Sequence, residues 1–440
     1  ALAVLDWTQP AAALARLVRA FDHGGYKNPI AVAKVVASHG AFVPGAVEVV
    51  AGTGAQPGFV SEVGEDVVQV ACADGELRMT RLCCLRGLPL DLGALQRYGV
   101  MQGVRLPLAD AGLRTLRTSL GTATAAHEDA WVEVLRRQEP LPVPDGNPGT
   151  GSPDPAELAV ALPPAAAEAT AALCVAFLMR ATAAAECTLG VRLPAHVPFV
   201  DGAGELVVQA PPANFAFAAP GGSAAGTSIG DAGRTTTASA LQQIAATLRA
   251  HAARGPLLRE LLVRRPDALP PTTPLEPPVR LAIACPARPL PAGAIEFAVG
   301  QGGQVVLRFD QHALPRERAE ALLRRLQVFA RATHGHQDQP LAAVPILEAA
   351  ELEQLLRTWN QSDAPAPAEP CVHRQFVAMA QKRPEHVALR VRDEAMSYGQ
   401  LLQRVERLAG WLRGRGVGIG DRVGICVQRG FGMVAAVLAT

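Results

Sequence analysis

Residues 294–310 have the sequence AIEFAVGQGGQVVLRFD. Two runs rich in branched and aromatic side chains, 294–299 and 304–310, are separated by the glycine-rich residues 300–303. Such runs favour strands, and a glycine-containing connection between them is typical of a β-hairpin. This stretch therefore predicts the centre of a sheet.

The residues around this hairpin predict helices and further strands. Residues 279–285 form another apolar, branched run, and residues 315–331 have helical periodicity with proline at the first turn. Helical patterns also cover 165–185 and 238–253, and a strand is expected to end near Val191. We therefore expect an α/β lobe in the middle of the chain.

The beginning of the chain has a different pattern. Residues 9–21 predict an amphipathic helix, and 47–50, 67–72 and 77–82 predict short strands. Asp74-Gly75 lies between the last two runs and is a hairpin signal. This segment predicts a small β-barrel with one helix.

The end of the chain alternates helix and strand patterns. Helices are predicted over 373–382 and 398–413, and strands over 387–391 and 423–427. Strands that alternate with helices at this spacing are typical of a parallel α/β sheet, which we expect to be incomplete here. The overall fold class is therefore multidomain α/β.

Length and composition agree with several domains. The chain has 440 residues, about three domains of roughly 150 residues each. Hydrophobic residues make up 49%, which excludes a disordered chain or a coiled coil, and the net charge of +1 argues against bulk nucleic-acid binding. Proline-rich and glycine-rich residues at 140–155 and 364–367 indicate linkers. The expected segments are 1–85, 86–155, 156–350, 351–370 and 371–440.

The cysteines and the termini add three expectations. Eight cysteines show no Cys-x-x-Cys spacing, so we expect free thiols: Cys72, Cys83, Cys84, Cys174, Cys187, Cys285, Cys371 and Cys426. No basic leader and no unbroken apolar run of membrane length is present. The chain starts at Ala1 without Met, and Thr440 falls inside an apolar helical pattern, which suggests a piece of a longer protein.

The last segment resembles the opening of an adenylation (AMP-binding) domain of the nonribosomal peptide synthetase type. The resemblance rests on Trp359-Asn360, His373-x-x-Phe376, Arg383-Pro384-x-x-Val387-Ala388-Leu389, Ser397-Tyr398-x-x-Leu401, Leu408-Ala409 and Gly416-Val417-x-x-Gly420-Asp421-Arg422-Val423. The family's phosphate loop, adenylate-contacting residues and catalytic lysine are not among these. The resemblance therefore implies that this segment does not form an adenylate by itself.

Residues 221–235 have a composition that a phosphate loop also shows. They are rich in Gly, Ser and Thr, whose backbone and hydroxyl groups can cradle phosphates. They lie before the adenylation-like segment, without a lysine and without a buried strand before them. We expect an ordinary loop.

The middle segment resembles a condensation domain, mainly its C-terminal lobe. The resemblance rests on His127-Glu128-Asp129-Ala130-Trp131, Pro140-Leu141-Pro142-Val143-Pro144, the helix at 171–180, Arg308-Phe309-Asp310 and Pro340-Leu341 to Pro345-Ile346-Leu347. That family uses a His-His-x-x-x-Asp-Gly motif, whose second histidine acts on the attacking amine. The sequence has no adjacent histidine pair, so we expect a degenerate, structural lobe.

His336-Gln337-Asp338 also looks like a condensation motif. It follows the closing helix, and His334 lies two residues before it. These side chains could be considered as metal ligands, but no further ligand lies nearby in the sequence. A solvated loop is the favoured interpretation.

The first segment resembles the C-terminal subdomain of formyltransferases related to methionyl-tRNA formyltransferase. The resemblance rests on Asp6-Trp7-x-x-Pro10-Ala11, Leu17-Val18-Arg19-Ala20-Phe21 and Gly25-Tyr26-x-Asn28-Pro29. The family's Asn, His and Asp catalytic set belongs to the preceding subdomain. Residues 1–82 contain six Lys and Arg against eight Asp and Glu, whereas a barrel that grips tRNA should be basic. A small or carrier-bound amine is the better-fitting substrate.

These resemblances imply an internal piece of a nonribosomal peptide synthetase starter module that is inactive alone. We expect no catalytic, cofactor-binding or metal-binding residue in this chain. The parent would be an amino-acid-activating ligase that uses ATP with Mg²⁺, 10-formyltetrahydrofolate and a phosphopantetheine carrier. Its partners would be the carrier and the remaining synthetase domains, in the cytoplasm, without nucleic acid or membrane. The alternative is a formyltransferase-type or ligase-type enzyme with a non-catalytic scaffold or interaction lobe.

Overall fold

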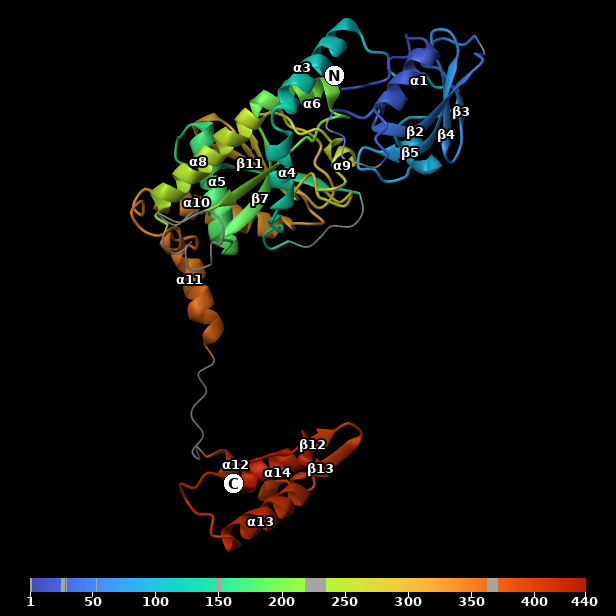
Figure 1. Cartoon of the computed structure of the whole chain (residues 1–440). Coiled ribbons are helices and arrows are strands. Elements are labelled where there is room, and N and C mark those ends of the chain that lie inside the picture. Colours follow the sequence, from blue (N-terminus) through green and yellow to red (C-terminus); the bar gives the residue numbers. More distant parts are fainter. Residues whose placement is uncertain are drawn as a thin grey trace. The chain divides into compact units, whose positions relative to one another are not determined.

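The computed structural model describes residues 2–24, 28, 30–52, 54–146, 152–217, 235–361 and 371–440. The chain divides into two compact units, Ala1–Leu352 and Glu353–Thr440. In Figure 1 the first unit runs from blue through yellow to orange and contains two sheets. The second unit, in orange to red, contains a two-stranded sheet.

The first sheet has the strand order β1-β2-β5-β4-β3, with every pair antiparallel. Its strands are β1 (Val35–Val36), β2 (Ala41–Val50), β3 (Val60–Val63), β4 (Val67–Ala71) and β5 (Glu76–Cys84). Helix α1 (Ala11–Ala20) packs against β2 and β5 and buries Leu14 and Val18. The predicted helix and three strands are confirmed, and they form the expected small β-domain.

The hairpin between β4 and β5 also fixes the start of α1. The Cys72 amide donates to the Gly75 carbonyl at 2.7 Å, which closes the turn at Asp74-Gly75. The Asp74 carboxylate accepts from the Ala11 amide at 2.8 Å, at the first residue of the helix. Trp7 is buried in the same core and lies in a turn before α1.

Three helices follow the first sheet: α2 (Leu92–Arg97), α3 (Ala111–Ala125) and α4 (Glu128–Arg136). Asp91 and Asp110 cap the first two, because their carboxylates accept from the amides of Ala94 and Leu113 at 2.6 and 2.7 Å. These three helices are not among those predicted from the sequence. Helix α3 buries only Leu120 and Thr124, so its apolar pattern is weak.

The second sheet has the strand order β6-β11-β10-β9-β7-β8. Its strands are β6 (Pro155–Ala161), β7 (Glu186–Arg192), β8 (Pro212–Ala216), β9 (Val279–Ile283), β10 (Ile295–Val299) and β11 (Gln304–Asp310). β9 is parallel to β7 and β10, and the other pairs are antiparallel. The predicted hairpin at 294–310 therefore lies inside a mixed sheet.

Helices α5 (Ala167–Thr182), α8 (Thr237–Arg254) and α10 (Arg316–Thr333) pack on this sheet. α5 contacts both α8 and α10, as well as β9 and β10. The core includes Phe177, Phe297, Phe309 and Phe329. Helices α5, α8 and α10 and strands β7, β9, β10 and β11 agree with the sequence prediction of an α/β lobe, whereas β6 and β8 were not predicted. The lobe also contains α6 (Val197–Ala203), α9 (Leu261–Arg264) and the 3-10 turns η1 (Pro194–His196), η2 (Gln301–Gly303) and η3 (Leu341–Ala343).

A helix and a 3-10 turn follow the lobe, α11 (Ala349–Leu356) and η4 (Thr358–Asn360). Neither element contains a buried residue. The predicted linker at 364–367 lies outside the described residues, and so do 218–234 and 147–151 of the two earlier loops.

The second unit continues with α12 (Val372–Lys382), β12 (Val387–Val391), β13 (Glu394–Ser397), α13 (Tyr398–Gly414) and α14 (Phe431–Ala439). Ser397 begins α13 with a capping box, in which its hydroxyl accepts from the Gln400 amide. Leu401, Val405 and Ala435 form the buried apolar cluster. The predicted helices and the first strand are confirmed.

The predicted strand at 423–427 is wrong, and so is the expected parallel pairing. β12 pairs antiparallel with β13, through a turn in which Arg392 has φ of 53°. Residues 424–427 are exposed, and no described strand lies beside them. An apolar run becomes a strand only where a neighbouring backbone supplies hydrogen-bond partners.

Candidate site at the junction of the first sheet and the α/β lobe

An apolar seam joins the first sheet domain to the α/β lobe. It contains Leu2, Val36, Ala41 and Leu85 from the first part of the chain. These side chains share one buried cluster with six residues of α3 and the lobe, namely Leu120, Val200, Ala203, Leu206, Val207 and Leu258. Because both sides are buried together, the two domains form one compact unit.

A chain of buried charges crosses the same seam. The Lys34 ammonium, just before β1, contacts the Glu260 carboxylate just before α9, and their side chains are 0% and 3% exposed. Lys34 also donates to the Leu2 carbonyl. Burial lowers the pKa of Lys34, while the Glu260 carboxylate acts in the opposite direction.

Arg264 extends this charge chain to α4. Its Nε lies 3.1 Å from the second oxygen of Glu260, and its guanidinium is bidentate to Glu128, with one contact at 3.1 Å. Arg265 pairs with Asp129 at 3.0 Å. Glu128 and Asp129, from the condensation-like motif, therefore hold α4 against α9.

Asn28, from the formyltransferase-like motif, supports the seam from the other side. Its main-chain N–H donates to the Arg264 carbonyl at 2.9 Å, and its side-chain NH₂ donates to the carbonyls of Phe21 and Ala31. Its side-chain oxygen accepts from the amides of Ile30 and Ala31. Asn28 is 2% exposed, and these bonds occupy both the NH₂ group and the oxygen of its side chain. Its role is therefore structural.

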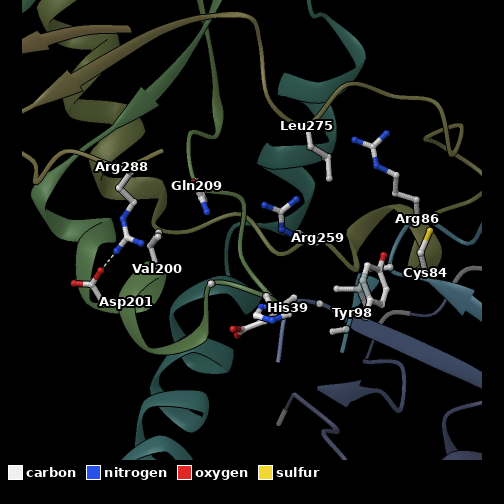
Figure 2. A pocket seen from close by; sticks show the side chains of 15 residues that line it. His39, Cys84, Arg86, Tyr98, Val200, Asp201, Gln209, Arg259, Leu275 and Arg288 are labelled. Carbon is white, nitrogen blue, oxygen red and sulfur yellow. Dashed lines mark ion pairs between the residues drawn. The ribbon is translucent and has the colours of Figure 1, made fainter. Parts of the chain in front are cut away.

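A pocket of about 560 Å³ lies beside this seam. Figure 2 shows its walls, which both domains supply. The first domain contributes His39, Gly40, Ala41, Cys84, Leu85, Arg86 and Tyr98. The lobe contributes Val200, Asp201, Gly204, Glu205, Gln209, Arg259, Leu275 and Arg288. Pockets of this size at domain junctions are common ligand sites.

Three guanidinium groups line the pocket, and they differ in their partners. Arg288 pairs with Asp201, and Arg259 donates to Glu276 at 2.8 Å and to the Val207 carbonyl at 2.9 Å. Arg86 contacts only backbone carbonyls, of Pro271 and Thr273, both at 3.5 Å. Within the described chain, Arg86 therefore has no carboxylate partner.

Tyr98 forms another wall of the pocket. Its ring lies against Gly40, where an added Cβ would come within 2.6 Å of a ring carbon. Figure 2 shows its hydroxyl directed to the side of the pocket that Arg86 and Arg259 line. Burial raises the pKa of Tyr98, whereas the charges of Arg259, Arg97 and Arg86 act to lower it. Arg86, Arg259 and Tyr98 therefore line the same pocket.

The remaining condensation-like residues have structural partners. Trp131 is buried and packs edge-on against His251 at 5.4 Å, with Arg254 over its ring at 5.1 Å. Arg308 and Arg192 both pair with the buried Glu296 at 2.9 Å.

Asp310 is also buried and holds the surrounding loops together. Its carboxylate accepts from the amides of Asp154, Gly293 and His312 at 2.8–3.1 Å.

The histidine-containing loop after α10 forms no metal cluster in the described part of the chain. His334 is exposed, and His336 bonds through Nδ1 to the Ala332 carbonyl at 2.8 Å. Most of the Gly/Ser/Thr-rich run at 221–235 lies outside the described residues.

The adenylation-like motif residues build the second unit. The ring centroids of Phe376 and Tyr398 are 6.1 Å apart, and Leu401 is buried. The Asp421 carboxylate accepts from the Gly418 amide at 2.8 Å, and Gly420 has φ of 92°. These roles are structural.

Sequence reasoning missed the pocket and the Lys34–Glu260 pair. Both are assembled from segments far apart in the chain, and no local pattern connects them. The available signal was weak: Lys34 is one of few lysines and lies within an apolar run before the first strands.

Two protein families match parts of the chain. Residues 1–88 match the formyl transferase C-terminal domain, and residues 376–440 match AMP-binding enzymes. These matches agree with the first and last segments of the sequence analysis.

Curated relatives are peptide synthetases. A linear gramicidin synthase of Brevibacillus parabrevis is 30% identical over 175 residues, which is 35% of this chain and 3% of the relative. Malpibaldin synthetase of Mortierella alpina is 36% identical over 114 residues, 26% of this chain and 2% of the relative. The chain thus spans only a small fraction of these relatives.

Among solved structures, the nonribosomal peptide synthetase FmoA3 in its AMPPNP-bound form aligns with a TM-score of 0.46 and 19% identity. That alignment covers 99% of this chain and 46% of the other.

The family matches and relatives define a multidomain protein of the peptide synthetase class. The chain is a nonribosomal peptide synthetase segment with a formyltransferase C-terminal domain and an adenylation-domain region. No helix in the described residues combines the length and apolar character that a membrane crossing needs.

Proposed function

We propose that this chain is the junction region of a formylating peptide synthetase module. Its parts are a formyltransferase C-terminal domain (1–85), a connector (86–155), a condensation-like lobe (156–350), a linker (351–370) and the start of an adenylation domain (371–440). The condensation-like lobe serves as a scaffold and carries no condensation chemistry.

The Lys34–Glu260 ion pair carries this proposal. It is fully buried, and Arg264 continues it to Glu128, so charges from both domains have their partners across the seam. A buried charge that loses its partner is costly, so the two domains are stable in this arrangement. A formyltransferase-like domain fixed in this way keeps a constant position on the lobe.

The partners of the lobe's buried charged residues support a scaffold role. Condensation chemistry needs a histidine free to act on an amine, and the sequence has no adjacent histidine pair. The buried Glu296 and Asp310 are occupied by arginines and backbone amides. None of them is available as a general base.

The complete protein would activate an amino acid with ATP and Mg²⁺, formylate an amine with 10-formyltetrahydrofolate, and hold its substrate on a phosphopantetheine carrier. The carrier and the other synthetase domains would be its partners, and the cytoplasm its compartment.

The test uses the complete protein that contains this chain. Amino-acid-dependent ATP–pyrophosphate exchange is measured, and the carrier-bound product is identified by mass spectrometry with a formyl-folate donor. Glu260→Gln should lower the formylated carrier product and leave the exchange rate unchanged, whereas the exposed-site control Glu62→Gln should change neither. Absence of amino-acid-dependent exchange in the complete protein, or equal product from both variants, would overturn the proposal.

A further inference from the structure

The pocket between the first domain and the lobe has an unbalanced positive charge. Three arginines line it (Arg86, Arg259 and Arg288) against two carboxylates, Asp201 and Glu205. Asp201 pairs with Arg288, and the Glu276 carboxylate is shared between Arg259 and Arg280. Arg86 remains, with only two long contacts to carbonyl oxygens. A half-buried guanidinium without a carboxylate favours an anionic partner.

Tyr98 gives the pocket a neutral donor near this charge. Its hydroxyl has no hydrogen-bond partner among the described residues, although the ring is held against Gly40. Because burial raises its pKa, Tyr98 keeps its proton at neutral pH and can donate it in a hydrogen bond. His39 and Gln209 line the same space with further polar groups.

We propose that this pocket binds a small ligand with an oxyanion, either a carboxylate or a phosphate ester. Arg86 and Arg259 contact the oxyanion, and the Tyr98 hydroxyl donates a hydrogen bond to the ligand. The volume of about 560 Å³ accommodates a small organic molecule and not only an ion. Because both domains supply the wall, ligand binding strengthens their junction.

The pocket is independent of the proposed catalytic steps. It needs no ATP, folate or carrier, and its residues lie in the single compact unit Ala1–Leu352. Its test therefore uses the 440-residue chain itself.

The chain is titrated by calorimetry with inorganic phosphate and, in a separate arm, with acetate, at constant ionic strength. We expect saturable binding in at least one arm. Binding of phosphate alone assigns a phosphate ester, and binding of acetate alone assigns a carboxylate. Saturable binding in neither arm overturns the proposal.

Variants connect the binding to the pocket. Arg86→Gln should weaken binding about tenfold or more, since hydrogen bonds to charged groups are the strong ones. Arg16→Gln makes the same charge change at an exposed position of α1 and should leave the affinity unchanged. Tyr98→Phe removes one hydroxyl, keeps the ring against Gly40 and should weaken binding severalfold. Equal affinities in Arg86→Gln and Arg16→Gln would place the anion elsewhere and overturn the assignment.

Discussion

The Lys34 ammonium and the Glu260 carboxylate form an ion pair that is closed to solvent, with exposed fractions of 0% and 3%. Lys34 belongs to the formyltransferase-like domain, and Glu260 belongs to the lobe. The two partners are not equivalent. Glu260 also contacts Arg264, whereas the remaining contact of Lys34 is the Leu2 carbonyl.

This asymmetry predicts unequal effects of removing either partner. Glu260→Gln leaves a buried ammonium without a carboxylate and should cost about 3–5 kcal/mol of unfolding free energy. Lys34→Met leaves Glu260 with Arg264 and should cost less. Urea unfolding followed by the fluorescence of the buried Trp7 and Trp131 measures both changes.

The exposed pair Arg78–Glu62 is the matched control for this comparison. Its atoms are 3.7 Å apart and both side chains are more than 40% exposed. Glu62→Gln should change the unfolding free energy by less than about 1 kcal/mol. A larger loss from Lys34→Met than from Glu260→Gln would contradict the proposed distribution of charge.

Two buried histidines predict that the protein loses stability in mild acid. Burial lowers the pKa of His196 to about 4 and that of His251 to about 3, and for His251 the nearby His196 and Arg254 lower it further. The unfolded chain takes up protons near the ordinary value of 6.5, before the folded chain does. The stability that the two neutral histidines contribute is therefore fully present above pH 6.5. It is lost as the pH falls from 6.5 toward their pKa values in the folded protein.

At about pH 5 each of these histidines should cost roughly 2 kcal/mol, because one pKa unit corresponds to about 1.4 kcal/mol. Melting temperatures between neutral pH and pH 5 measure the effect. His251→Phe should flatten the pH dependence, even if it lowers stability at neutral pH. The control His373→Gln changes an exposed histidine and should keep the wild-type slope. Equal slopes in both variants would contradict the assignment.

In the turn between β10 and β11, alanine substitutions at two neighbouring glycines should lower the stability by different amounts. Gly302 and Gly303 both have positive φ, 67° and 79°. A Cβ at Gly303 would lie 2.6 Å from the Leu162 carbonyl oxygen and 2.7 Å from that of Pro163, whereas a Cβ at Gly302 meets nothing within 4 Å. Gly303→Ala therefore combines backbone strain with a collision against main-chain atoms.

Gly303→Ala should cost about 2–4 kcal/mol of unfolding free energy, and Gly302→Ala about 1–2 kcal/mol. Urea unfolding of the two variants side by side isolates the collision, because the backbone strain is similar in both. Equal losses would show that the backbone beside Leu162 moves away at little cost.

The sequence predicted those elements whose pattern is local and strong. Helices α8 and α10 and strand β11 bury one face, which sets their periodicity, whereas α5, β9 and β10 are buried nearly throughout and show as continuous apolar runs. Both patterns are local, so the predicted positions agree with the structure. Strand β13 was not predicted, because its turn contains no glycine and Arg392 adopts the left-handed conformation itself.

The candidate site could not be predicted for a different reason. His39, Arg86 and Tyr98 come together with Arg259 and Arg288 only after both domains have packed. No fixed sequence spacing relates these residues, because they belong to different elements of two domains. A sequence pattern therefore does not indicate that they line one pocket. The family motifs, in contrast, were recognisable in the sequence, and Asn28, Glu128 and Asp129 serve in the seam.

The isolated 440-residue chain is expected to show no amino-acid-dependent ATP–pyrophosphate exchange. Residues 376–440 contain one lysine, Lys382, which is exposed at the end of α12, and the glycine-rich residues 414–424 include no Ser, Thr or Lys. The triphosphate would therefore lack the hydroxyl groups and the ammonium group that align it. The assay compares the chain with a protein-free blank, and the complete protein serves as the positive control. Exchange by the chain alone above that blank would contradict the prediction.

The apolar stripe on α11 and η4 gives the last prediction. Leu352, Leu355, Leu356 and Trp359 follow helical spacing, which is compatible with two roles: a platform for the adenylation domain, or packing within the lobe. In the structure Leu352, Leu356 and Trp359 are 44%, 64% and 68% exposed, and α11 has no buried residue.

Leu356→Ala combined with Trp359→Ala should therefore change the unfolding free energy of this chain by no more than about 0.5 kcal/mol, because exposed side chains gain little on folding. Leu326→Ala on α10 is the matched control: this leucine is 0% exposed, and its loss should cost about 2–5 kcal/mol. Urea unfolding of the three proteins decides between the interpretations. If the double variant lost as much stability as Leu326→Ala, the stripe would be packing within its own lobe, and a platform for another domain would have no free surface there.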